Sequence, residues 1–231
     1  MDKMLLLLGV SILLSEVFAQ TDLTGKVFVF PRESESDYVK LIPRLEKPLE
    51  NFTLCFRTYT DLSRPHSLFS YNTKNKDNEL LIYKERMGEY GLYIENLGAI
   101  VRGVEEFASP VHFCTSWESS SGIAEFWVNG IPWVKKGLKK GYTVKTQPSI
   151  ILGQEQDNYG GGFDKSQSFV GEMGDLNMWD SVLTPEEIKS VYEGSWLEAN
   201  ILDWRTLNYE MSGYAVIRPR CVALSSYNKI S

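Results

Sequence analysis

Side chains that carry oxygen are concentrated in residues 154–164, which read Gln-Glu-Gln-Asp-Asn-Tyr-Gly-Gly-Gly-Phe-Asp. Hard cations such as calcium bind several carboxylate, amide and carbonyl oxygens, and a glycine-rich loop can turn its carbonyls inward. Glu155 and Asp157 point the same way if the backbone is extended, and Gln156 offers a carbonyl oxygen. The acidic spacing does not follow the EF-hand pattern. These residues alone support a divalent-cation site and a solvated acidic turn about equally.

The elements that position this loop are predicted to be β-strands. Short runs of alternating, β-branched or aromatic residues, separated by turn residues, are typical of an antiparallel sandwich. The pair Asn129-Gly130 predicts a tight hairpin, since both central positions of a type I′ turn need positive φ. The expected strands are 26–30, 51–57, 79–84, 91–94, 111–117, 124–128, 131–134, 149–152, 169–173 and 175–179.

One helix is expected within residues 184–194. Thr184 can cap its first turn, Pro185 suits the first helical position, and Glu187 can reach back to complete a capping box. Ile188 and Val191 then fall on one face. The helix is therefore predicted to pack one face on a sheet.

The first nineteen residues predict a secretory signal peptide. They combine Lys3, an apolar run over residues 4–14, and Val17 and Ala19 at the spacing that signal peptidase prefers. The run is shorter than the roughly 20 residues that span a bilayer. In a secreted chain, Asn51-Phe52-Thr53 is a usable glycosylation acceptor and cysteines can form disulfides.

The overall charge narrows the possible partners. The chain has 231 residues, with 30 acidic and 24 basic side chains and a formal net charge of −6. This balance opposes general attraction to phosphate backbones. Two histidines and three cysteines supply zinc chemistry poorly.

A family resemblance decides between the two interpretations of the acidic loop. Residues 112–119, His-Phe-Cys-Thr-Ser-Trp-Glu-Ser, resemble the pentraxin signature, and residues 25–33, 119–127 and 152–157 are also similar to that family. The resemblance runs from Gln20 to about Pro219. It implies an all-β, flattened two-sheet jelly roll of the concanavalin or lectin type, with one helix packed on one face. The expected organisation is a signal peptide (1–19), a pentraxin domain (20–219) and a C-terminal extension (220–231).

The resemblance also implies site residues. Two calcium ions per subunit are expected on one face, with Glu155 and Asp157 bridging them and Gln156 binding through its carbonyl. Open coordination positions would then accept phosphate or carboxylate oxygens. The implied metal ligands are Asp77, Asn78, Glu155, Gln156, Asp157 and Gln167. The implied apolar ligand pocket is formed by Leu81, Tyr83 and Tyr93, and core packing is the alternative role for these three.

The cysteines and one departure from the family pattern complete the implied features. Cys55 and Cys114 match the family's intrachain disulfide, whereas Cys221 lies beyond the usual family end. Gly98 aligns with the family's charged side chain that discriminates headgroups. The resemblance therefore leaves the choice between choline and ethanolamine open.

The implied function is that of a secreted plasma protein without enzymatic activity. Its implied ligands are phosphoethanolamine, phosphocholine and anionic or pyruvylated sugars. A homopentamer is expected, with amyloid fibrils, chromatin and complement as partners and no membrane insertion. Two alternatives are a calcium-binding adhesion module similar to laminin G and a jelly-roll glycoside hydrolase that uses Glu155 and Asp157.

Overall fold

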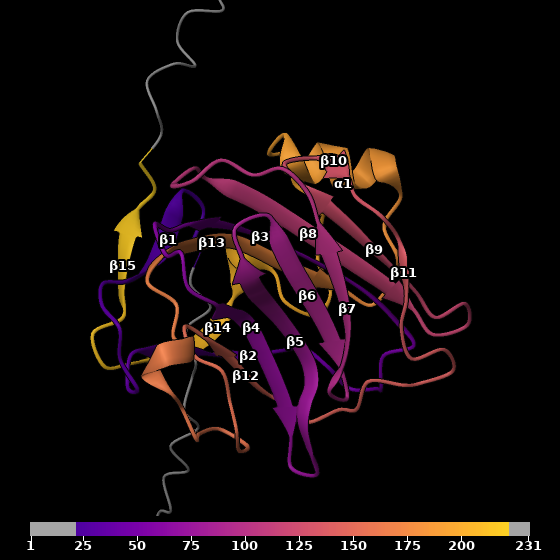
Figure 1. Cartoon of the computed structure of the whole chain (residues 1–231), viewed down its shortest axis with the longest axis horizontal. Coiled ribbons are helices and arrows are strands. Elements are labelled where there is room, and N and C mark those ends of the chain that lie inside the picture. The colour runs from indigo at the N-terminus through magenta and orange to yellow at the C-terminus, as the bar shows by residue number, and fades with distance from the viewer. Residues whose placement is uncertain (1–21, 222–231) are drawn as a thin grey trace, which may run out of the picture.

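The chain folds into two antiparallel sheets that pack face to face (Figure 1). The computed structural model describes residues 22–221. The expected signal peptide (1–19) and residues 222–231 of the expected extension lie outside them. Within the described part of the chain, no helix is long and apolar enough to cross a membrane.

The strand order is β10-β9-β8-β3-β13-β1-β15 in the first sheet, where β11 also pairs with β9, and β14-β2-β12-β4-β5-β6-β7 in the second. The first sheet contains β1 (Lys26–Phe30), β3 (Asn51–Tyr59), β8 (Val111–Glu118), β9 (Ile123–Val128), β10 (Ile131–Pro132), β11 (Lys136–Gly137), β13 (Gly171–Trp179) and β15 (Val216–Pro219). The second contains β2 (Tyr38–Ile42), β4 (His66–Thr73), β5 (Lys76–Arg86), β6 (Glu89–Ile94), β7 (Leu97–Arg102), β12 (Ser149–Leu152) and β14 (Asn208–Ser212). The expected all-β sandwich is confirmed.

The main hydrophobic core lies between the sheets. In β3, Phe52, Leu54 and Phe56 are at most 1% exposed and belong to this core. Cys55 points to the opposite face of the strand, because successive side chains of a strand alternate. Helix α1 (Pro185–Tyr192) covers that outer face, where Ile188 packs with Trp127 and Trp179. The helix is therefore on the side of the first sheet, away from the second sheet (Figure 1).

Two local predictions are confirmed. Val128 pairs with Ile131, and Asn129 and Gly130 have φ values of 51° and 75°, as the predicted hairpin requires. The Thr184 side chain accepts a hydrogen bond from the backbone N–H of Glu187, and the Glu187 side chain accepts one from the N–H of Thr184. The capping box therefore begins α1 where the sequence indicates.

Other local expectations were wrong or incomplete. The strands expected at 169–173 and 175–179 form one strand, β13, with an irregular register between Gly174 and Asn177. Asp175, with φ of 49°, occupies this bulge. His66, which directly follows Pro65, begins β4 and is only 1% exposed. Strands β2, β4, β7, β11, β14 and β15 were not predicted.

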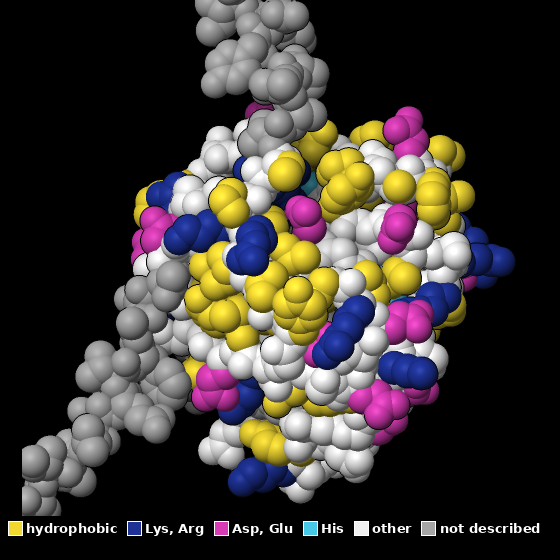
Figure 2. Space-filling view, turned by 90° about the vertical axis from the view of Figure 1, so that its left-hand side faces the viewer, with side chains coloured by type: hydrophobic (Ala, Val, Ile, Leu, Met, Phe, Trp, Pro, Cys, Tyr) yellow, Lys and Arg dark blue, Asp and Glu magenta, His cyan; other side chains and the backbone are white. Residues whose placement is uncertain are grey.

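The side of the molecule that carries β1 and β15 is shown in Figure 2, where hydrophobic side chains gather between charged ones. A groove of 390 Å³ is lined by Val27, Tyr59 and Pro110 together with Arg220 and Cys221. Cys221 is exposed and forms no disulfide. An accessible thiol therefore lies beside an apolar groove.

Candidate calcium-binding site

The first part of the predicted metal site is the hairpin between β4 and β5. Asp77 and Asn78 are the second and third residues of β5, directly after the turn. Asn72, near the end of β4, donates from Nδ2 to Asp77 Oδ1 over 2.8 Å, and its Oδ1 accepts from the backbone N–H of Asn78 over 2.9 Å. Asn78 has a φ of 46°, in the left-handed region that asparagine tolerates better than most residues. The Asn72 amide therefore fixes the geometry of both predicted ligands.

The second part is the acidic loop that follows β12. The Gln156 side chain is fully buried, and its Nε2 donates to Ser70 O and Ser149 O, both over 3.0 Å. Gln156 Oε1 accepts from the N–H of Gly160 over 2.9 Å. These bonds occupy the amide, so the backbone carbonyl is the atom of Gln156 that can face a ligand. That carbonyl accepts from Asn72 Nδ2 over 2.6 Å, which joins the loop to the hairpin.

Buried oxygens without hydrogen-bond partners indicate whether these residues could bind a cation. Three buried side-chain oxygens at predicted ligands have no hydrogen-bond partner among the described residues: Asn78 Oδ1, Glu155 Oε2 and Gln167 Oε1. A buried polar atom without a partner carries a desolvation cost of about 1–3 kcal/mol. Neutral amide oxygens and a carboxylate oxygen are the ligand types that suit a hard cation. The residues present therefore fit calcium.

The raised pKa of Glu155 also favours a cation at this site. Glu155 is 3% exposed. Burial raises the pKa of its carboxyl to about 7, and the negative charges of Asp157 and Asp77 add to the increase. The protein alone therefore disfavours a charged Glu155, whereas a nearby cation would favour it.

Three further residues of the loop differ in their surroundings. Gln167 ends a short 3-10 helix, η1 (Lys165–Gln167), and Asp164 caps it by accepting from the N–H of Ser166 over 2.8 Å. Asp157 is exposed. Asp164 is thus engaged in shaping the loop, whereas Asp157 is an exposed residue of it.

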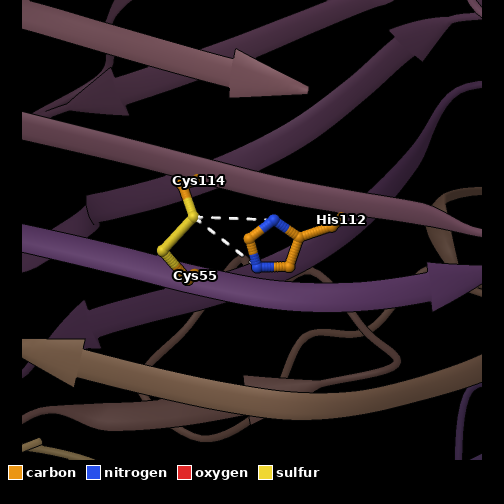
Figure 3. A group of neighbouring side chains, drawn as sticks. All are labelled: Cys55, His112 and Cys114. Carbon is orange, nitrogen blue, oxygen red and sulfur yellow. Dashed lines mark hydrogen bonds between the residues drawn. A yellow bond between two sulfur atoms is a disulfide. The ribbon is translucent and has the colours of Figure 1, made fainter. Parts of the chain in front are cut away.

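A second group of metal-type ligands lies on the other sheet. Cys55, His112 and Cys114 are the only histidine, cysteine and carboxylate side chains of residues 22–221 that place three ligand atoms within 4.8 Å of one another. Cys55 and Cys114 form a disulfide across paired positions of β3 and β8, and His112 lies beside Cys114 Sγ (Figure 3). Sulfurs in a disulfide are not thiolates, so this group is not a metal site. The carboxylates of Asp77, Glu155 and Asp157 do not place three oxygens within this distance of one another.

The residues implied for the ligand pocket share the outer face of the second sheet. Leu81 pairs with Tyr93 across β5 and β6, and Tyr83 pairs with Gly91. Their neighbours Leu80 and Ile82 point into the core instead. Leu81 is 6% exposed, whereas both tyrosines are partly exposed. The pairing therefore brings Leu81 and the tyrosines together on the sheet that carries the Asp77–Asn78 hairpin.

The implied modification site lies elsewhere. Asn51 is the first residue of β3 and is partly exposed at the rim of a groove formed with Lys47, Thr143 and Asp180. Thr53 of the same sequon is fully buried and donates its hydroxyl to Ser181 O over 2.7 Å. Asn51 therefore remains reachable in the folded chain, whereas Thr53 does not.

Comparison with known proteins identifies the family. The model of the Pentaxin family matches residues 26–219. The chain belongs to the pentraxin family. Three relatives cover nearly the whole pentraxin chain: serum amyloid P-component of Mesocricetus auratus is 83% identical over 100% of both chains, that of Homo sapiens is 66% identical over 95% of this chain and 98% of its own, and C-reactive protein of Sus scrofa is 52% identical over 95% and 99%.

A solved structure shows the same pentraxin fold. The native heptameric SAP-like pentraxin from Limulus polyphemus superposes with a TM-score of 0.77 at 22% identity, and the match covers 85% of this chain and 96% of that one. At this identity the match concerns the fold. The two-sheet arrangement is therefore shared between distant pentraxins.

Proposed function

We propose that this pentraxin is a secreted calcium-dependent binding protein for phosphate-bearing and other anionic ligands. The observation that carries the proposal is the set of partnerless buried oxygens on Asn78, Glu155 and Gln167. With Asp77, Asp157 and the Gln156 carbonyl, they would hold two calcium ions. Bound calcium would supply positive charge and open coordination positions for phosphate, carboxylate or pyruvylated-sugar oxygens.

The protein's own residues would prepare the site. Asn72 holds the hairpin and the loop together through bonds to Asp77 and the Gln156 carbonyl. Leu81 and Tyr83 would offer apolar surface to the carbon atoms of a phosphoethanolamine or phosphocholine headgroup.

Calcium titration by calorimetry and retention on phosphoethanolamine beads test the proposal. We expect binding in millimolar calcium and release by EDTA. The Glu155→Gln variant should lose retention, because it removes a buried charged ligand. Glu198→Gln, which changes an exposed acid, is the matched control and should bind normally. Retention of the wild-type protein in EDTA would contradict the mechanism.

Assembly and biological partners belong to the same proposal. We propose a signal peptide at residues 1–19, a glycan on Asn51 and a homopentamer that presents several weak sites to repetitive surfaces. The names of the relatives support amyloid as one such surface, and chromatin and complement are further proposed partners. Light scattering with and without calcium tests the pentamer.

No catalytic role is proposed for Glu155 and Asp157. Coordination would keep both carboxyls ionised, and hydrolysis of a glycoside needs a general acid. Hydrolysis of a β-glucan by the purified protein would instead support the enzyme alternative.

A further inference from the structure

A cavity of 150 Å³ lies beside the end of helix α1, on the outer side of the first sheet. A single water needs about 10–15 Å³ of such space, so the cavity can admit a small organic molecule. Its walls come from β8, β13, α1, the turn before β1 and the residues that follow β15. None of its lining residues belongs to the candidate calcium site. The cavity is therefore a second place where this pentraxin could bind a ligand.

The charged side chains around the cavity are mainly basic. Arg205, in a short 3-10 helix, η2 (Trp204–Thr206), and Arg220, just after β15, line it together with Asp175 of the β13 bulge. Asp175 Oδ2 accepts from Arg57 Nε over 3.1 Å and from Arg220 Nη1. Among the described residues, the other guanidinium N–H groups of Arg220 have no partner. Three guanidinium groups thus surround one carboxylate, which makes this region basic on a chain with a formal net charge of −6.

The Arg205 guanidinium is oriented by an aromatic ring instead of an acid. It lies 4.9 Å from the centroid of the Trp196 ring, within the range of a cation–π interaction. The Arg205 backbone N–H donates to Asp203 Oδ1 over 2.9 Å, but its guanidinium forms no hydrogen bond or ion pair among the described residues. Asp22 is close enough to respond to this charge, yet its Oδ1 already accepts from the N–H of Thr24 over 2.8 Å. The guanidinium therefore keeps its N–H donors available for a ligand.

His112 adds a buried donor to the lining. The residue is 1% exposed, and its imidazole lies on the outer face of β8 beside the disulfide (Figure 3). Among the described residues, its ring nitrogens have Cys114 Sγ as their only partner, 3.9 Å from Nδ1 and 3.8 Å from Nε2. Sulfur is a weak acceptor, and a neutral imidazole has one N–H donor and one acceptor nitrogen. His112 therefore retains hydrogen-bonding capacity that the protein satisfies poorly.

Apolar surface completes the cavity. Val191, Trp196 and Trp204 all line it, and Trp196 is exposed to solvent. The buried Trp204 donates from Nε1 to Leu23 O over 2.8 Å, so the carbon atoms of its ring remain for contact with a ligand. Aromatic walls suit the carbon atoms of a small molecule. The fork of a guanidinium matches the two oxygens of a carboxylate. The lining therefore suits both parts of an organic acid.

We propose that this cavity is a calcium-independent binding site for a small organic carboxylate, whose oxygens accept from Arg205 and Arg220 while its carbon atoms pack on Trp196. His112 offers a further N–H to a ligand that fills the buried part of the cavity. The site is separate from the proposed calcium-dependent function, because the two share no residue.

Calorimetry in EDTA with benzoate and benzamide tests this assignment. The two probes have nearly the same shape, but only benzoate is charged. We expect benzoate to bind with millimolar affinity and benzamide to bind at least about tenfold more weakly, the scale of a hydrogen bond to a charged group. Arg205→Gln should weaken benzoate binding about tenfold for the same reason. Arg218→Gln, which changes an exposed arginine of β15 outside the lining, is the matched control and should bind as the wild type does.

The histidines give a second readout. The chain contains only His66 and His112, so protein with ¹³C-labelled histidine gives two imidazole signals in NMR, which His66→Asn assigns. Benzoate should shift the signal of His112 and leave that of His66, which lies in the second sheet, in place. An unshifted His112 signal, or equal shifts of both signals, would overturn the placement of the ligand in this cavity.

The binding results separate the two proposals. If benzoate does not bind in EDTA, or binds no more tightly than benzamide, the carboxylate site falls and the calcium-dependent function is unaffected. Equal losses in Arg205→Gln and Arg218→Gln would also overturn the site, because they would show general attraction to surface charge. Benzoate binding that requires calcium would place the ligand at the candidate calcium site instead, which contradicts the proposal made for this cavity.

Discussion

Acid should destabilise this protein through its two histidines well before its paired carboxylates titrate. His66 and His112 are each 1% exposed. Burial lowers the pKa of His66 to about 4, with smaller contributions from the positive charges of Lys84 and Arg64. Burial lowers the pKa of His112 to about 3, and the charge of Arg57 adds to this. Both side chains are therefore neutral in the folded protein at neutral pH.

The sign and size of the effect follow from proton linkage. An unfolded histidine titrates near 6.5, so below this pH the unfolded chain binds protons that the folded chain excludes. Stability is lost as the pH falls through 6.5, and the loss levels off below the folded pKa values. Each pH unit costs about 1.4 kcal/mol per histidine, or about 2 kcal/mol each at pH 5. The two histidines together predict a loss of about 4 kcal/mol.

Two carboxyl groups also make stability depend on pH, one over a lower pH range and the other in the opposite direction. The pKa of Asp37 is lowered to about 2, mainly by Arg32, so its contribution is lost only as the pH falls below about 4. Glu155 has a raised pKa in the absence of calcium, so its unfavourable charge is relieved as the pH falls from 7 and partly offsets the histidines. Wild type and histidine variants share these contributions, which cancel when the two are compared.

Guanidinium unfolding in EDTA, at one protein concentration and with the disulfide intact, measures the effect. The variants are His66→Asn and His112→Asn; in the first, the new amide can replace the hydrogen bond from His66 Nδ1 to Arg64 O. Between pH 7.5 and 5, the free energy of unfolding of the wild type should fall by about 2 kcal/mol relative to either variant. Equal pH slopes in all three proteins would refute the argument.

Three further predictions concern binding and stability. Asn72→Ala should weaken calcium affinity about tenfold in calorimetry without removing a ligand, because Asn72 orients Asp77; an unchanged affinity would contradict that role. Replacing both Cys55 and Cys114 by serine should lower the free energy of unfolding by about 4 kcal/mol, since the bridge closes a separation of 59 residues; a loss below about 1 kcal/mol would count against this entropic account. Thr184→Ala should cost about 1 kcal/mol in thermal unfolding, whereas Thr184→Ser should restore the cap.

Features of the fold that depend only on residues adjacent in the sequence could be predicted from it. The capping box at Thr184 and the Asn129-Gly130 turn are local, so their residue types suffice. The burial of His66 could not be predicted, because the preceding Arg64 and Pro65 are residue types typical of a loop. In the fold its ring lies beside that of Phe169, which is distant in sequence and whose ring centroid is 5.6 Å away.

The candidate site likewise contains residues that could be predicted from the sequence and a residue whose role depends on the fold. The acidic loop was visible from its composition, and the family resemblance added Asp77 and Gln167. Asn72 was missed, because a neutral residue in an unrecognised strand gives no signal by itself. Its role appears only when the fold brings it to the Gln156 carbonyl, 84 residues away. Composition shows where charge is concentrated, whereas folding determines what holds it in place.

The pairing of β1 with β15 brings the two ends of the described chain together. Lys26 lies opposite Pro219, and the N–H of Arg220 donates to Gly25 O over 2.8 Å. A short linker could therefore join residue 22 to residue 221, and new ends could be opened in the surface segment 103–110 between β7 and β8. Such a circular permutant would make Cys221 an internal residue of the chain, and it would leave the hairpin and loop of the candidate metal site in unbroken sequence.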